Sequence, residues 1–78
     1  MEPKKADIVI DAREMEPPEP FVVTMDALDA MDPSHTLLLI LTREPHPLYR
    51  ALVKQGYAYR TEITTDYTIE ILIWRKAA

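Results

Sequence analysis

A chain of 78 residues has room for one small hydrophobic core, so we expect a single domain over residues 1–78. Hydrophobic residues make up 47% and charged residues 28%, a composition typical of folded globular proteins and not of disordered ones. The net charge of −4 argues against nucleic acid as a ligand, and the absence of cysteine excludes disulfides, thiolate catalysis and sulfur-ligated zinc.

The longest apolar run, residues 37–41, is far shorter than the ~20 residues that cross a bilayer, so we expect no membrane contact. Residues 1–7 hold no apolar stretch long enough for a signal peptide. Because a protein that folds without disulfides suits a reducing compartment, we expect it in the cytoplasm.

The first half of the chain predicts a strand, a helix and a second strand. Residues 8–10 are apolar and β-branched, which favours a strand. Residues 15–20 contain three prolines and two glutamates, a composition that suits the entry into a helix. The helix that follows ends near residues 32–33, and its predicted apolar stripe comprises Phe21, Val22, Met25, Leu28 and Met31, with Thr24 away from it. Residues 36–42 then form a strand with an entirely apolar centre.

The second half predicts a second helix and two strands. Residues 43–47 again place prolines before a helix, whose apolar side carries Leu48, Leu52 and Val53. Gly56, the only glycine, stands where a left-handed helix cap favours it. Strands over residues 57–64 and 67–74 are joined by a tight turn at Thr65–Asp66. One face of this strand pair is predicted to carry Tyr57, Tyr59, Ile63, Tyr67, Ile69, Ile71 and Ile73.

Right-handed crossovers place both helices on one face of the sheet and both strand-to-helix turns at one edge. Ligands of open α/β sheets gather at such an edge. The candidate binding residues there are Arg13, Glu16, Pro17, Glu19, Arg43 and His46. Apart from Pro17, each of these residues has a structural and a functional interpretation. His46 either shields the start of the second helix or binds a metal, and the glutamates either complement the helix dipoles or form an acid/base pair. The arginines either form ion pairs within the domain or bind an anion. We expect no catalytic residue, metal or cofactor.

The second face of the sheet is left bare by this arrangement. Alternation along the strands directs five apolar side chains onto it: Val9, Leu38, Ile40, Leu72 and Trp74. A contiguous apolar patch on a small domain is typical of an interface, so these residues form the candidate interface.

The chain resembles the TusA/SirA-like sulfur-carrier proteins in Asp11-Ala12 and in Pro18-Glu19-Pro20 before an apolar helix. Those proteins have a Cys-Pro-x-Pro motif whose cysteine carries a persulfide, and here Pro17 occupies the cysteine position. The chain is more similar still to the cysteine-less DUF2249 domain, in Asp11-x-Arg13, in Glu16-Pro17-Pro18-Glu19-Pro20 and in Pro45-x-Pro47-Leu48-Tyr49 with Gly56. The resemblance implies an α+β two-layer sandwich of β-α-β-α-β-β order, with strand order 1-2-4-3 and the last strand antiparallel. The resemblance to this family implies no particular activity for the chain.

These observations predict a non-enzymatic binding or adaptor module that uses the open sheet face for a protein partner or for self-association. An alternative is an accessory of a sulfur-relay or redox pathway that docks onto carrier partners without bearing sulfur. A further alternative is a small-molecule or metal-binding subunit that uses His46.

Overall fold

The computed structural model of the chain describes residues 6–64 and 66–76. The elements are β1 Ile8–Asp11, α1 Glu19–Ala30, β2 Thr36–Leu41, α2 His46–Lys54, β3 Tyr57–Ile63 and β4 Ile69–Arg75. Their order is the predicted one, and their boundaries lie close to the predicted ones. Thr65 of the predicted turn and residues 1–5 of the N-terminal segment lie outside the described residues.

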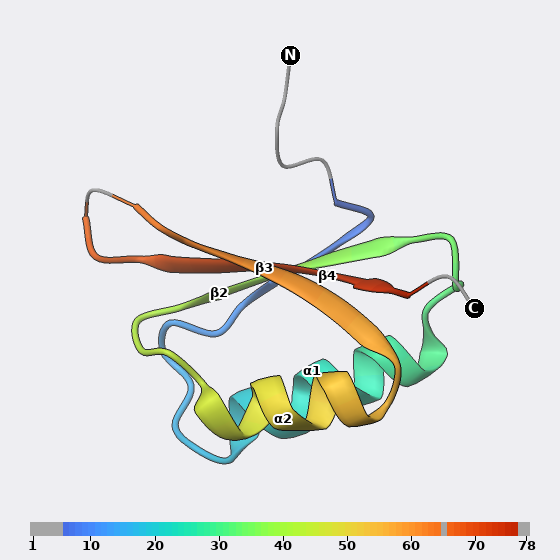
Figure 1. Cartoon of the computed structure of the whole chain (residues 1–78). Coiled ribbons are helices and arrows are strands. Elements are labelled where there is room, and N and C mark those ends of the chain that lie inside the picture. Colours follow the sequence, from blue (N-terminus) through green and yellow to red (C-terminus); the bar gives the residue numbers. More distant parts are fainter. Residues whose placement is uncertain (1–5, 65, 77–78) are drawn as a thin grey trace.

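The strands form one four-stranded sheet in the order β1-β2-β4-β3. β1 pairs in parallel with β2, whereas β4 runs antiparallel to both β2 and β3, so that β4 alone opposes the other strands. Figure 1 shows both helices against the same face of this sheet, which leaves the opposite face open. The predicted two-layer architecture and strand order are therefore confirmed.

The core lies between the sheet and the helices. Alternate residues of the two central strands, among them Leu37, Leu39, Ile71 and Ile73, point toward the helices and are fully buried. The helices bury Leu28, Leu48 and Leu52 against them. The hydroxyl of Tyr57 donates a buried hydrogen bond to the carbonyl oxygen of Leu28 at 3.2 Å, which links β3 to the end of α1.

The buried side of α1 differs from the predicted stripe. Thr24 is 0% exposed, whereas Phe21 and Val22 are exposed, so the prediction was wrong for these three residues. Successive helix residues are rotated by about 100°, so the inward line through Thr24 and Leu28 turns Val22 toward solvent. Phe21 belongs to the first turn of α1, which borders a groove at the edge of the molecule.

Two further predictions were wrong. Val53 is 65% exposed, because it follows the fully buried Leu52 by one position and is therefore rotated by about 100° away from the sheet. Tyr67 is exposed and has a φ of 65°, so it belongs to the turn before β4 and not to the strand. The prediction for Gly56 was right, since its φ of 87° lies in the left-handed region that favours glycine after a helix.

Candidate functional site

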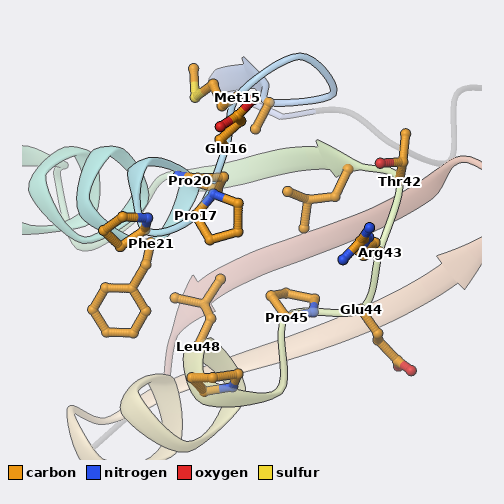
Figure 2. Close-up of a pocket in the computed structure, with 14 residues that line it drawn as sticks. Met15, Glu16, Pro17, Pro20, Phe21, Thr42, Arg43, Glu44, Pro45 and Leu48 are labelled. Atoms are coloured by element: carbon orange, nitrogen blue, oxygen red, sulfur yellow. The ribbon is translucent and has the colours of Figure 1, made fainter.

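The candidate site is a groove of about 710 Å³ between the starts of α1 and α2, at the edge where β1 and β2 end. Figure 2 shows 14 residues around it, from the β1–α1 loop and first turn of α1 on one side and the β2–α2 loop on the other. Most are apolar, and five are prolines: Pro17, Pro18, Pro20, Pro45 and Pro47. We call this site the turn-edge groove.

The prolines explain why the helix starts offer few amide donors to the groove. Each proline lacks an N–H, and the amide of Glu19 is bound to the carbonyl oxygen of Glu16 at 2.8 Å. At α2, the amides of Leu48 and Tyr49 both bind the carbonyl oxygen of Pro45, at 3.0 and 3.2 Å. A phosphate bound by helix-start amides is therefore disfavoured at both helices.

The two arginines at this edge have different surroundings. Arg13 donates to the carboxylate of Asp11 through Nε at 2.9 Å and Nη2 at 2.7 Å, which confirms the expected internal pairing. These hydrogen bonds lower the pKa of Asp11 from 3.8 to about 2. Arg43 has no ion pair or side-chain hydrogen bond within residues 6–64 and 66–76, so internal pairing was the wrong expectation for it. Arg43 is exposed and lines the groove.

Glu44, next to Arg43, is held by other residues. The hydroxyl of Tyr49 donates to Glu44 Oε2 at 3.1 Å and shares a 2.7 Å hydrogen bond with Thr61. Burial is the main cause that raises the pKa of Tyr49 above its ordinary value of 10.0. His46 Nε2 lies 3.9 Å from Glu44 Oε1. Figure 2 shows the side chain of Glu44 directed away from the groove.

The structure brings some of the predicted binding residues together and separates others. Glu16, Pro17 and Arg43 line the turn-edge groove. Arg13 instead borders a separate depression with Asp11 and Glu14, while Glu19 and His46 are exposed and do not line the groove.

Sequence reasoning missed the apolar lining of the groove. Met15 and Phe21 stand on the α1 side, and Leu41 and Leu48 contribute from the end of β2 and the start of α2. Leu41 and Leu48 are also core residues, so hydrophobic periodicity could not distinguish the two roles. The signal that could have found the groove is the pair of proline-rich segments placed at one edge of the sheet.

The open sheet face carries the predicted apolar side chains. The strand register aligns Val9, Leu38 and Leu72 in one row across β1, β2 and β4, and Trp74 pairs with Thr36 in the adjacent row. Ile40 follows Leu38 on this face of β2. Val9 is 59% exposed and Leu38 only 8%, whereas Ile40, Leu72 and Trp74 are half-buried.

The described residues hold neither a metal-binding cluster nor a membrane-spanning helix. Within residues 6–64 and 66–76, no three histidine or acidic side chains gather closely enough to hold a metal ion, so the alternative based on His46 has no ligand cluster there. In the same ranges, neither helix has the length and apolarity needed to span a membrane.

Comparison with known proteins gives a family and a fold. Residues 9–75 match the family described as "Uncharacterized conserved protein (DUF2249)". The crystal structure of a SirA-like protein from Desulfitobacterium hafniense is similar, with a TM-score of 0.78 and 19% sequence identity, over 90% of this chain and 99% of that one. No curated protein matches the sequence.

Proposed function

The chain belongs to the DUF2249 family, and from its geometry we propose that it is a non-enzymatic binding module that contacts a protein partner, or a second copy of itself, through the open sheet face. The observation that carries the proposal is the apolar row of Val9, Leu38 and Leu72 with Trp74 beside it, on the face that no helix covers. Contiguous apolar patches on monomeric domains mark interaction sites more often than scattered apolar residues do.

The position of the patch also supports this proposal. The strand register fixes which side chains lie on this face, and the paired strands are stiff, so contact with the face needs little reordering of the domain. Val9 is an exposed valine on the edge strand, while Leu72 and Trp74 belong to the central strand β4. A partner could therefore contact the patch from the β1 edge inward. We further propose that the protein acts in the cytoplasm.

The test is site-specific photo-crosslinking in the native cells, with p-benzoylphenylalanine replacing Val9 or, as the matched control, Val53. Both positions are exposed valines, 59% and 65%, but Val53 lies on α2 and away from the patch. We expect a discrete protein adduct from position 9 only, with a mass that distinguishes a second copy from another protein. Equal adducts from both positions, or none from either, would contradict the proposal.

A second candidate function is that of an accessory in a sulfur-relay or redox pathway, which docks onto carrier proteins. The fold similarity to a SirA-like protein favours it, together with Pro17 at the position where the carriers have their cysteine. Mixing the protein with a SirA-like carrier and recording its amide NMR spectrum tests this directly. Unchanged spectra at an excess of carrier would rule this role out for the carrier used.

A further inference from the structure

The turn-edge groove has the size and lining of a small-molecule site. Its volume of about 710 Å³ lies within the range of roughly 300–1,000 Å³ that is usual for ligand pockets. Phe21 and Pro17 on the α1 side and Pro45 on the α2 side form its accessible apolar walls, above the buried Leu41 and Leu48. These side chains can cover an aromatic ring or a short alkyl chain.

The groove lining contains one cation, Arg43, and two carboxylates, Glu16 and Glu44, and the cation is the group that is free to bind a ligand. Arg43 is the only cationic residue that lines the groove, and within the described part of the chain no carboxylate lies at ion-pair distance from its guanidinium. Glu44 is bound by Tyr49 and directed away, while Glu16 stands on the opposite side of the groove (Figure 2). A guanidinium with free donors binds a carboxylate through two parallel hydrogen bonds.

Other ligand classes fit the groove less well. A phosphate would draw on several helix-start amides, but the prolines have none and most of the others are already bonded. Among the described residues of the first turn of α1, Phe21 alone keeps an unbonded amide, which is one donor where a phosphate needs several. An extended peptide needs main-chain partners along its length, and the five prolines supply no N–H donors for it. A small acid needs only Arg43 and the apolar walls.

We propose that the turn-edge groove binds a small carboxylic acid with an apolar body, whose carboxylate pairs with Arg43 and whose body lies between Phe21 and Pro45. This site is separate from the open sheet face, so a positive or negative binding result at the groove does not bear on the proposed function. Binding is non-covalent and leaves the ligand unchanged.

The experiment is an amide NMR titration with 3-phenylpropionate and with its neutral amide, 3-phenylpropanamide. For the acid we expect saturable shifts that centre on residues 12–21 and 41–48. The variant Arg43→Met keeps an unbranched side chain and removes the guanidinium with its charge, and it should bind the acid at least about tenfold more weakly, as expected for charge-assisted hydrogen bonds. Arg60→Met is the matched control, because Arg60 is an exposed arginine on β3, outside the groove. It should leave the affinity unchanged.

Each result supports or overturns the proposal. Equal binding of the acid and the amide, equal losses in both arginine variants, or tighter binding of inorganic phosphate would overturn it. So would shifts outside the groove, or no saturation at about 10 mM acid, well above the ~1 mM that marks a weak site. The same spectra report whether each variant keeps its fold.

Discussion

The completely buried hydroxyl of Thr24 gives a sharp test of how α1 packs on the sheet. Thr24 is 0% exposed, and no described residue forms a hydrogen bond with its Oγ1. Burying a hydroxyl without a partner costs about 1–3 kcal/mol in proteins. Thr24→Val replaces the hydroxyl with a methyl group of similar size, and the two residues have similar helix propensities. We therefore expect the variant to be more stable by about 1 kcal/mol, the lower end of that range.

Urea unfolding followed by circular dichroism measures this difference, and the dependence of the unfolding free energy on urea should stay the same. For a domain of this size, a gain of about 1 kcal/mol raises the melting temperature by about 4–8 °C. Thr24→Ser is the matched control, because it keeps the hydroxyl and loses a buried methyl group, which should cost about 1 kcal/mol.

The expected order of stability is therefore valine, threonine, serine. A valine variant less stable than the wild type would refute the reasoning, because it would show that the hydroxyl forms a hydrogen bond in solution. A serine variant as stable as the wild type would show that the methyl group of Thr24 is not packed in the core.

Three further predictions concern single substitutions at Arg13, Gly56 and Tyr49. Asp11 should titrate near pH 2 by NMR, and its pKa should return toward 3.8 in Arg13→Gln. Because the pKa of Asp11 is lowered in the folded protein, the stability that this pair contributes is present above pH 3.8 and is lost as the pH falls toward 2. An unchanged titration midpoint of Asp11 in the variant would contradict this. Gly56→Ala should destabilise the fold by about 1 kcal/mol in urea unfolding through its φ of 87° alone, since an added Cβ has nothing within 4 Å; a neutral result would show that the cap relaxes. Tyr49→Phe should cost about 1 kcal/mol in the same assay by removing the hydrogen bonds of the hydroxyl to Thr61 at 2.7 Å and to Glu44 at 3.1 Å, and a more stable variant would argue against these bonds.

The sheet could be predicted closely from the sequence, because strand alternation has a strict period of two residues. Thr36 and Thr42 flank the apolar run of β2, which indicated that Leu38 and Ile40 lie on the open face, as the register confirms. The strand order came from the family resemblance and not from the pattern, since alternation does not say which strands are neighbours.

The helix faces were harder to predict, because a rotation of one residue changes which side chains are buried. Thr24 is polar and was assigned to the solvent side, yet tertiary packing buries it. On the short helix α2, two leucines and a valine within six positions did not fix the inward direction, and Val53 faces solvent.

The candidate site was predicted in position but not in composition. The turn edge was expected to hold a cluster of charged residues, and instead it holds a mostly apolar groove with three charged residues in its lining, Glu16, Arg43 and Glu44. The pattern could not show that Arg13 is bound to Asp11 while Arg43 is not, because both arginines have acidic neighbours in the sequence. Pairing depends on side-chain geometry over a few ångströms.

The alternation of β2 has a consequence for how the domain can be occupied. Leu41, on the helix side, reaches the turn-edge groove, while Leu38 and Ile40 emerge on the opposite side of the same strand. A metabolite in the groove and a protein resting on the sheet would thus be separated by the thickness of one backbone layer. The two occupants would not compete for space, so a single domain of this size could carry both at the same time.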